Sequence, residues 1–218
     1  MAINAEESNV LIFTACYNER DNISRLIEEI IHYVPNADIL VVDDNSPDET
    51  AAVVENISKQ NRKVKIVKRP GKRGIGSAHK YAIIYAVQNS YDYLVTMDAD
   101  FSHDPASLPG LLASGGRGIF VTGSRYCPGG KSDYSGYRDI VSRLGNIAAR
   151  LALGVPLKEL TTYFRVFDVE SLRQIPLWKI DSNGYSYGVQ LIYQLRKKRI
   201  ELVEVPIHFV DRLHGTSK

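Results

Sequence analysis

The sequence predicts an α/β fold in which helices cover both faces of a mostly parallel central sheet, as in Rossmann-like domains. Short apolar runs typical of buried strands alternate with segments of helical periodicity through the first hundred residues. Three of these runs are followed by carboxylates, and open α/β sheets place their ligands at the carboxyl ends of strands. The 218 residues suit one α/β domain of good size, and no low-complexity linker divides them. We therefore expect residues 1–218 to form a single domain.

The first hundred residues contain the most regular elements. Apolar, partly β-branched runs indicate strands, and apolar residues at helical spacing indicate helices. In chain order we expect a strand over Val10–Cys16, a helix carrying Ile23, Leu26, Ile27, Ile30 and Ile31, strands over Ile39–Val42 and Val64–Val67, a helix from about Ser77 to Gln88, and a strand over Tyr93–Met97. Repeated strand–helix–strand units of this kind predict parallel pairing.

A further helix is predicted to begin at Ser46. Ser46 is a favourable cap, Pro47 suits the first helical position, and Glu49 completes a capping box. The chain between the second and third strands is therefore expected to enter its helix directly after Asp43-Asp44-Asn45.

After Asp104 the alternation becomes less regular, although periodicity and glycine content still define elements. We expect a short helix over Pro105–Leu112, a strand over Ile119–Thr122, a glycine-rich loop over Cys127–Gly136, a helix with Ile140, Leu144, Ile147 and Leu151 on one stripe, a helix over Tyr185–Lys198, and an alternating strand over Glu201–Val210. The basic run at 196–199 suits the negative end of a helix dipole, and we expect no further role for it.

The helix with the apolar stripe has two interpretations. Its polar positions include Arg138, Arg143 and Arg150 against a single acid, Asp139. In the first interpretation the stripe packs in the core and the basic face is solvated. In the second the helix lies at a membrane surface, with its basic face toward anionic headgroups. The sequence is consistent with both.

Composition excludes several classes of protein. Hydrophobic residues make up 44% and charged residues 24% of the chain, as in ordinary soluble globular proteins. A net charge of +2 is too small to indicate nucleic-acid binding. The polar N-terminus is unlike a signal peptide, and no apolar run approaches the ~20 residues of a membrane span. Because Cys16 and Cys127 lie far apart without ligand spacing, we expect reduced thiols and a cytoplasmic location.

The segment Tyr93–Asp104 carries the clearest chemical signal. Asp98 and Asp100 follow the strand, and residues two apart in an extended chain point to the same side. Two carboxylates at such a short distance from each other repel unless a cation lies between them. Mg²⁺, held by one or two carboxylates and substrate phosphates, fits this pair, and Mn²⁺ accepts the same oxygen ligands. Taken alone, however, Asp-x-Asp is more commonly a solvated turn.

Other acidic residues are expected at the same edge of the sheet. Glu19 follows the first strand, and Asp43 and Asp44 end the second. A receiver-type signalling domain would also gather aspartates and Mg²⁺ there, but it has no use for the arginines of the second half. These arginines, expected in loops or helix starts, are Arg125, Arg138, Arg165 and Arg212. An acidic, metal-binding half with an arginine-bearing half suits a diphosphate substrate and a second anionic substrate.

Two smaller features are ambiguous. Gly74-Ile75-Gly76 before a helix can cradle a phosphate, but its spacing matches neither G-x-G-x-x-G nor a P-loop, so a tight turn is favoured. Among the five histidines only His103, beside the acidic pair, is a candidate for the site. No Ser/His/Asp or Cys/His set stands out.

Short motifs follow one another along the chain in a recognisable order. They are Tyr17-Asn18-Glu19-Arg20, Asp43-Asp44-Asn45-Ser46-Pro47-Asp48, Gly74-Ile75-Gly76-Ser77-Ala78, Met97-Asp98-Ala99-Asp100-Phe101-Ser102-His103, Gly123-Ser124-Arg125-Tyr126, Ser142-Arg143 with Asn146, Phe164-Arg165, and Glu204-Val205-Pro206-Ile207 through Asp211-Arg212 to Gly215-Thr216-Ser217-Lys218. Each is weak alone. Together they resemble the dolichol- or polyprenyl-phosphate mannose synthases of glycosyltransferase family 2, which have the GT-A fold.

The resemblance implies roles for the matching positions. The implied nucleotide-binding residues are Ala15, Tyr17, Glu19, Asp43, Asp44, Gly74 and Asp98. Arg212 and Lys218 are implied to close over the diphosphate. The implied ligands of Mg²⁺ or Mn²⁺ are Asp98 and Asp100, while Ser102 replaces the glutamine ligand of some relatives. The implied ligands of the acceptor phosphate are Arg125, Arg138 and Ser142. The expected catalytic residues are Asp100, Arg125 and Arg138.

The resemblance also implies a reaction: inverting transfer of a sugar, mannose favoured, from a nucleotide diphosphate sugar to a polyprenyl or dolichyl phosphate. GDP-mannose is the favoured donor, a UDP-sugar such as UDP-glucose is the alternative, and the cytosolic face of a membrane is the expected location. A phosphate monoester, with a second pKa near ~6, is largely dianionic at neutral pH and needs no strong general base. The absence of an obvious triad is therefore expected.

Two positions depart from the family's Asp-x-Thr-Gly/Ser-Gly/Ser-Phe-Arg pattern. Glu159 replaces the aspartate, and Tyr163 replaces a small residue. The second hypothesis, transfer to a glycan hydroxyl, would need a base, for which Glu159 is the candidate. A third, a non-catalytic sensor of nucleotide sugars, is disfavoured by the intact acidic pair. Because some relatives continue into transmembrane helices, the chain is either a catalytic domain truncated before them or a form that only touches the membrane.

Overall fold

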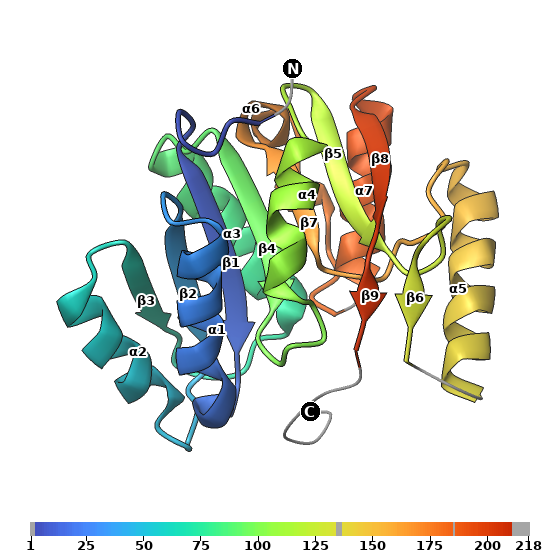
Figure 1. Ribbon diagram of the computed structural model, residues 1–218. Helices are drawn as coiled ribbons and strands as arrows, with labels where there is room; N and C mark the ends of the chain where they lie inside the picture. Colours follow the sequence, from blue (N-terminus) through green and yellow to red (C-terminus); the bar gives the residue numbers. More distant parts are fainter. Residues whose placement is uncertain (1–2, 134–136, 185, 211–218) are drawn as a thin grey trace.

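A seven-stranded sheet, formed by the described residues, runs through the centre of the molecule (Figure 1). The computed structural model describes residues 3–133, 137–184 and 186–210, without the side chain of Arg138. Across the sheet the strands lie in the order β3 (Val64–Lys68), β2 (Asp38–Asp43), β1 (Val10–Cys16), β4 (Tyr93–Asp98), β7 (Arg165–Asp168), β5 (Ile119–Ser124) and β8 (Glu201–Pro206). β7 is antiparallel to its neighbours β4 and β5, and the other pairs are parallel. The predicted mostly parallel α/β fold is confirmed.

Helices cover both faces of the sheet, as predicted. One face carries α1 (Arg20–Tyr33), α2 (Thr50–Gln60) and α4 (Leu108–Ala113), and the other carries α3 (Ile75–Gln88), α6 (Val169–Arg173) and α7 (Ser186–Lys197). Each set packs on the sheet in its own apolar core, and alternate residues of β1 serve the two cores. The remaining elements are the 3₁₀ turns η1 (Pro105–Ser107) and η2 (Leu177–Lys179), the helix α5 (Tyr137–Leu153), and the paired short strands β6 (Lys131–Ser132) and β9 (His208–Phe209).

The antiparallel strand β7 was not predicted. Arg165, expected in a loop, begins this strand and pairs with Thr96 and Thr122 on the two neighbouring strands. Its side chain is fully buried; its Nη2 donates to the Leu160 carbonyl oxygen at 2.8 Å, and its guanidinium lies 4.9 Å from the Tyr163 ring centroid. A strand of four residues that begins with arginine has no strand signature in the sequence. This segment forms a strand because β4 and β5, on its two sides, complete its backbone hydrogen bonds.

The predicted start of the second helix at Ser46 is wrong, because α2 begins at Thr50. Glu49, at its N-cap, has a left-handed backbone with φ of 66° and makes no capping hydrogen bond. Ser46 instead donates its hydroxyl and its backbone N–H to the Asp43 carboxylate. Asp48 takes over the expected capping role, since its Oδ1 accepts the Thr50 N–H at 3.0 Å. The carboxylate at the end of β2 competes for the serine, so the helix starts later.

Two elements of the second half are divided further than predicted. The expected strand over Glu201–Val210 is interrupted at Ile207, whose N–H donates to the Ser124 carbonyl oxygen, and becomes β8 and β9. The glycine-rich loop contains β6, which pairs with β9. The predicted helix over Pro105–Leu112 is a 3₁₀ turn followed by α4. These short pieces bring the chain after β5 and the chain after β8 side by side.

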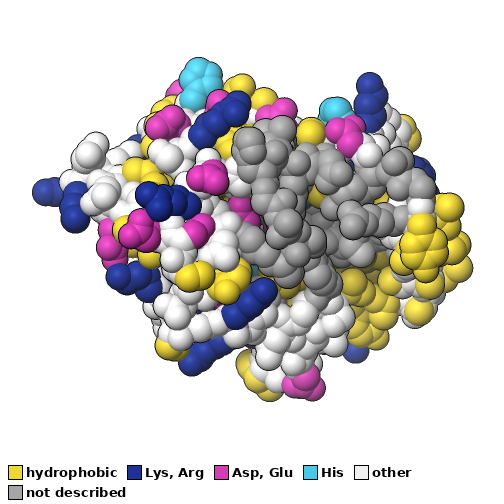
Figure 2. All heavy atoms as spheres, turned by 90° about the horizontal axis from the view of Figure 1, so that it is seen from below, with side chains coloured by type: hydrophobic (Ala, Val, Ile, Leu, Met, Phe, Trp, Pro, Cys, Tyr) yellow, Lys and Arg dark blue, Asp and Glu magenta, His cyan; other side chains and the backbone are white. Residues whose placement is uncertain are grey.

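The apolar stripe of α5 faces outward, so its core-packing interpretation is wrong. Its members Ile140, Leu144 and Leu151 are 55%, 61% and 76% exposed. The helix turns a buried polar residue, Asn146, toward the body of the molecule instead. In Figure 2 the apolar side chains gather at one end of the molecule, where α5 lies in Figure 1. Among the described residues no helix is long and apolar enough to cross a membrane.

Candidate active site

Three strands bring the predicted nucleotide and metal residues to one edge of the sheet. In the register of β1 with β4, Ala15 pairs with Asp98, and in that of β1 with β2, Cys16 pairs with Asp43. Paired residues on neighbouring strands are about 5 Å apart, so the carboxylates after β2 and β4 flank the end of β1. The convergence predicted from the strand ends is therefore present in the fold.

The loop after β1 is fastened to the loop after β2. The Asn18 N–H donates to the Ser46 hydroxyl, and the Glu19 N–H donates to the Thr50 hydroxyl, both at 3.0 Å. Asn18 has a left-handed backbone with φ of 58°. Glu19 is buried and accepts the Asn22 side-chain amide at 2.8 Å. Tyr17 lies between these tethers, and the Lys72 Nζ lies 4.7 Å from its ring centroid.

The two acids after β2 are already engaged by the protein. Asp43 is buried and holds Ser46 through two hydrogen bonds, as described above. Asp44 forms a buried ion pair with Arg69, and the Arg69 guanidinium also donates to the Ser77 hydroxyl at 2.6 Å. Ser77 lies in the first turn of α3. These acids thus hold the loop after β2 and link it to α3, in addition to any contact with a nucleotide.

The glycine turn before α3 packs against the protein backbone. A Cβ on Gly74 would lie 2.5 Å from the Asn183 carbonyl oxygen, and Gly74 has a φ of 84° that disfavours other residues. The Gly76 N–H donates to the same oxygen at 2.8 Å. Asn183 beside Gly74, and Tyr187 with Asn183 beside Gly76, leave no room for a side chain, which fits the tight turn that was the favoured interpretation of this motif.

The acidic pair after β4 presents oxygen donors of the kind that Mg²⁺ and Mn²⁺ prefer. Asp98 ends β4 with its side chain partly exposed, whereas Asp100 is buried. Ser102 orients Asp100 by donating its N–H and its hydroxyl to Oδ1 at 3.1 and 2.5 Å. In residues 3–133, 137–184 and 186–210 no group of three or more His, Cys, Asp and Glu side chains forms a metal cage. The pair therefore fits an ion that takes further ligands from water and substrate phosphates.

His103 lies beneath this pair as a neutral structural residue. Its Nδ1 accepts the Asp98 backbone N–H, and its Nε2 lies 3.0 Å from the Thr162 hydroxyl. Complete burial lowers the pKa of its imidazole to about 4 and outweighs the opposing charge of Asp100. The side chain therefore adds no positive charge beside the carboxylates, and it fixes the turn that carries them.

On the other side of the site, Arg125 is held by Glu159. Its Nε and Nη2 donate to the two carboxylate oxygens at 2.7 and 3.1 Å. Nη2 also lies 3.0 Å from the Thr161 hydroxyl and 3.4 Å from the Ser142 hydroxyl. Burial alone would raise the pKa of the Glu159 carboxyl, but hydrogen bonds and charge from Arg125 outweigh it and lower the pKa. Arg125 and Ser142 are thus brought together, and Glu159 is a poor candidate for a general base.

A small basic pocket opens next to Arg125 and Ser142. The Tyr126 hydroxyl donates to the Ser142 hydroxyl at 2.8 Å and forms one wall. The pocket, of about 170 Å³, is lined by Tyr126, Arg143, Asn146, Ile147, Arg150 and Lys158. Its cations come mostly from α5, and Ile147 belongs to the exposed apolar stripe. An anion with a hydrocarbon tail suits such a pocket, because charge and apolar surface meet at its mouth.

Phe209 joins the acidic and basic sides of the site. Its ring lies 5.6 Å from the His103 ring and 5.0 Å from the Arg125 guanidinium carbon. The geometry therefore brings Asp98, Asp100, Arg125 and Ser142 to one site. Arg212, Lys218 and the side chain of Arg138 lie outside the part of the chain that the structure describes.

Several residues of the site were not predicted from the sequence. Arg69 and Lys72 follow β3 without a recognisable motif, and Lys158 precedes the loop of Glu159. Arg143 was noted as part of the Ser142-Arg143 motif and of a basic face, and Arg150 as part of that face, but neither was given a role. Their spacing of seven residues placed both on one side of the helix, and this signal could have assigned them to a pocket.

Known proteins are similar to this chain over nearly all of its length. Undecaprenyl-phosphate mannosyltransferase of Micrococcus luteus is 36% identical over 210 residues, which cover 96% of this chain and 86% of the relative. Polyprenol monophosphomannose synthase of Mycolicibacterium smegmatis is 35% identical over 211 residues, covering 95% and 80%. A solved structure of glucosyl-3-phosphoglycerate synthase from Mycobacterium tuberculosis with Mn²⁺, UDP-glucose and phosphoglyceric acid has a TM-score of 0.68 at 22% identity, covering 98% of this chain and 74% of that one.

The sheet has the GT-A fold, as the likeness to the solved synthase shows. A family model described as glycosyl transferase family 2 matches residues 11–176. The chain belongs to glycosyl transferase family 2, and the predicted family and enzyme class are confirmed.

Proposed function

We propose that this glycosyltransferase transfers mannose from GDP-mannose to a polyprenyl phosphate, with inversion at the anomeric carbon. The observation that carries the proposal is the position of Arg125 and Ser142 between the acidic strand ends and the basic pocket on α5. Two anionic substrates are thereby separated, one on each side of the reacting centre. The two relatives named for polyprenyl-linked mannose transfer support the choice of mannose and of the lipid acceptor.

The residues of the chain supply position and charge compensation. The acceptor phosphate oxygen attacks the anomeric carbon, the bond from that carbon to the nucleotide diphosphate breaks, and the diphosphate leaves with the electron pair. Arg125, Arg138 and Ser142 hold the acceptor phosphate, while Arg212 and Lys218 compensate the leaving group. A phosphate dianion is already nucleophilic, so no side chain has to remove a proton. The Glu159 carboxylate is hydrogen-bonded to Arg125, which is consistent with a reaction that needs no general base. The same contact disfavours transfer to a glycan hydroxyl, which would need one.

On the donor side, Ala15, Tyr17, Glu19, Asp43, Asp44 and Gly74 surround the nucleotide. Asp98 and Asp100 would hold Mg²⁺ or Mn²⁺, which supplies positive charge to the leaving diphosphate when bound. The Mn²⁺ and UDP-glucose of the solved synthase support a divalent ion with a nucleotide sugar for this fold. A UDP-sugar such as UDP-glucose is therefore the alternative donor.

The enzyme acts on a lipid at the cytosolic face of a membrane in this proposal. The outward apolar stripe of α5, bordered by the cations of the basic pocket, suits insertion at the level of the lipid headgroups. The stripe touches the mouth of the acceptor pocket through Ile147. A polyprenyl chain that leaves the pocket along α5 would enter the bilayer directly.

A detergent assay with soluble components tests the reaction without a membrane. The enzyme is incubated with Mg²⁺, a short-chain polyprenyl phosphate, and either GDP-mannose or UDP-glucose, and the glycolipid is measured by mass spectrometry. The expected product is mannosyl phosphoryl polyprenol from GDP-mannose, lost on addition of EDTA and absent with the unphosphorylated polyprenol. Transfer to the unphosphorylated alcohol, or from UDP-glucose alone, would overturn the acceptor or the donor assignment respectively.

A further inference from the structure

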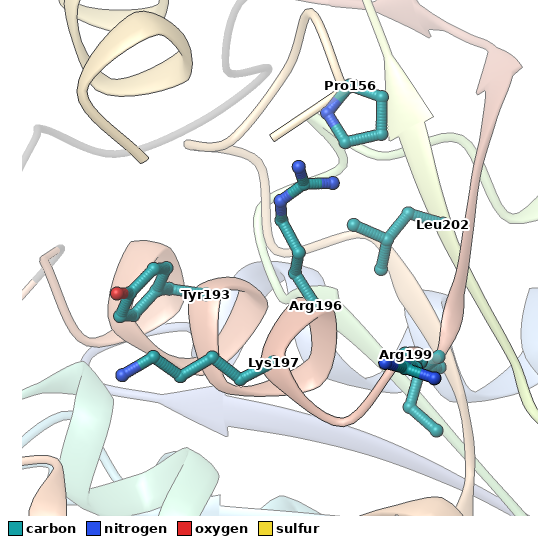
Figure 3. A pocket seen from close by; sticks show the side chains of 7 residues that line it. Pro156, Tyr193, Arg196, Lys197, Arg199 and Leu202 are labelled. Carbon is teal, nitrogen blue, oxygen red and sulfur yellow. The ribbon is translucent and has the colours of Figure 1, made fainter. Parts of the chain in front are cut away.

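A second basic groove lies at the far end of α7, outside the candidate active site (Figure 3). It has a volume of about 480 Å³ and is lined by Pro156, Tyr193, Arg196, Lys197, Arg199, Ile200 and Leu202. Three cations thus border an apolar floor. Figure 3 shows Arg196 extending from α7 toward Pro156, with Tyr193 and Lys197 along the same helix.

The described residues that line this groove include no acid. Glu201 lies between two lining residues, Ile200 and Leu202, but adjacent residues of a strand point to opposite faces. Within the described chain, the ion pairs involve none of the groove's cations. Lys197 lies 4.6 Å over the Tyr193 ring centroid, a contact that leaves its charge uncompensated. The groove therefore concentrates positive charge beside apolar surface.

The last carbonyl oxygens of α7 have backbone partners and do not need the basic side chains as caps. At the end of α7 the Gln194 and Leu195 carbonyl oxygens accept the Lys198 N–H, and the Leu195 oxygen also accepts the Ile200 N–H. The Arg196 carbonyl oxygen accepts the Arg199 N–H at 2.9 Å. The last turn is thus closed by backbone groups. Its basic side chains remain available to a ligand.

The groove adjoins the C-terminal end of α5. A Cβ on Gly154, the residue after α5, would lie 3.6 Å from the Arg196 Nη2, and Pro156 two residues later lines the groove. Leu151, 76% exposed, is in the last turn of α5. Cations that suit headgroups therefore lie near the end of the helix that carries the exposed apolar stripe.

We propose that this groove binds the headgroup of an anionic phospholipid and orients the enzyme on the membrane. The phosphate would lie against Arg196, Lys197 and Arg199, with the glycerol and first acyl carbons on the apolar floor. Tyr193 suits the boundary between the two, where tyrosine is enriched. This inference rests on the membrane attachment in the proposed function, but not on the reaction itself.

Flotation with lipid vesicles tests the groove. Wild type is compared with the triple variant Arg196→Gln/Lys197→Gln/Arg199→Asn on phosphatidylcholine vesicles with and without phosphatidylglycerol. Asn tolerates the left-handed backbone of residue 199, whose φ is 59°. Wild type is expected to prefer the anionic vesicles, and the triple variant to lose this preference, with a fall of roughly 10- to 100-fold in partitioning.

The matched control removes the same charge at the opposite edge of the sheet. Lys59→Gln/Arg62→Gln/Lys63→Gln lies at the end of α2 and the start of β3, and these charges are far beyond the screening length of about 8 Å from the groove. This control is expected to keep the preference. Equal binding of both triple variants to anionic vesicles, or no anionic preference of wild type, would overturn the headgroup groove.

The failures of the two proposals are distinguishable. Product formation by wild type in detergent supports the reaction whatever the vesicles show. Loss of the anionic preference in the triple variant supports the groove whatever the donor sugar is. Absence of wild-type binding to both kinds of vesicle would overturn the groove and the membrane attachment together.

Discussion

The two halves of the site are built in different ways. On the acidic side, Asp98 and the residues beside it are placed by the register of three parallel strands with consecutive helices. On the basic side, Arg125 is held by the buried Glu159 carboxylate, which comes from a distant loop, and by Ser142 of α5. The apolar face of α5 remains exposed. The acidic side depends on backbone pairing, whereas the basic side depends on side-chain partners. We therefore expect substitutions to separate activity from stability on the first side and to couple them on the second.

The largest effect should come from breaking the Arg125–Glu159 pair. Its two side chains are 6% and 0% exposed, so Glu159→Gln leaves a buried guanidinium without its counter-charge. We expect the free energy of unfolding to fall by about 3–5 kcal/mol, measured by urea denaturation. Glu170→Gln, which removes an acid from the exposed pair with Arg173, should cost under about 1 kcal/mol.

A double-variant cycle sharpens this comparison. Arg125→Met/Glu159→Leu removes both charges, and it should cost less than the sum of Arg125→Met and Glu159→Leu. If the three costs were simply additive, Glu159 would not be the partner that holds Arg125. That result would contradict the view that side-chain partners hold the basic side of the site.

Asp100→Asn should separate activity from stability on the acidic side. The amide keeps one acceptor for Ser102 but lowers the negative charge available to a divalent ion. We expect the transfer rate to fall by about 10²- to 10³-fold with a smaller change in unfolding than for Glu159→Gln. Asp104→Asn is the control, because Asp104 caps η1 and asparagine also caps. Equal rates for the two variants would exclude Asp100 from the reaction.

The exposed stripe of α5 should matter for membrane binding and little for folding. Leu144→Gln/Leu151→Gln replaces two outward leucines, and we expect partitioning onto phosphatidylcholine vesicles to fall at least about 10-fold. Ile84→Gln on α3, 45% exposed in wild type, is the matched control and should bind as wild type does. A large loss of stability in the double variant, or unchanged partitioning, would show that the stripe packs against protein instead.

The smallest effect concerns a buried histidine under the basic side. His79 lies among the Phe13, Tyr163 and Tyr187 rings, and burial, followed by the charge of Arg165, lowers its pKa well below the ordinary 6.5. Below pH 6.5 the unfolded chain therefore binds a proton that the folded chain does not. The contribution of His79 to stability is fully present above that pH and should fall by about 1 kcal/mol between pH 6.5 and 5.5.

Denaturation at both pH values measures this loss. His79→Leu should reduce the difference between the two values by about 1 kcal/mol. A difference that is the same in wild type and His79→Leu would assign the pH dependence to other groups.

The sequence alone determined the regular part of this protein. Apolar runs placed the strands β1 to β5 within one or two residues, and Asp98, Asp100, Asp43 and Asp44 were correctly expected at one edge. Strand periodicity and strand ends are local properties, so neighbouring residues suffice to predict them. The start of α2 was missed because Asp43, at a strand end, takes the serine that would otherwise cap the helix.

Only the tertiary structure decided the basic side. Arg125 meets Glu159 across 34 positions of sequence, and β7 exists because β4 and β5 both pair with it. The direction of α5 was also undetermined, because an apolar stripe of helical period is the same whether it faces a core or a lipid surface. In the fold α5 packs through Asn146, Ala149 and Leu153, and this contact leaves the stripe exposed.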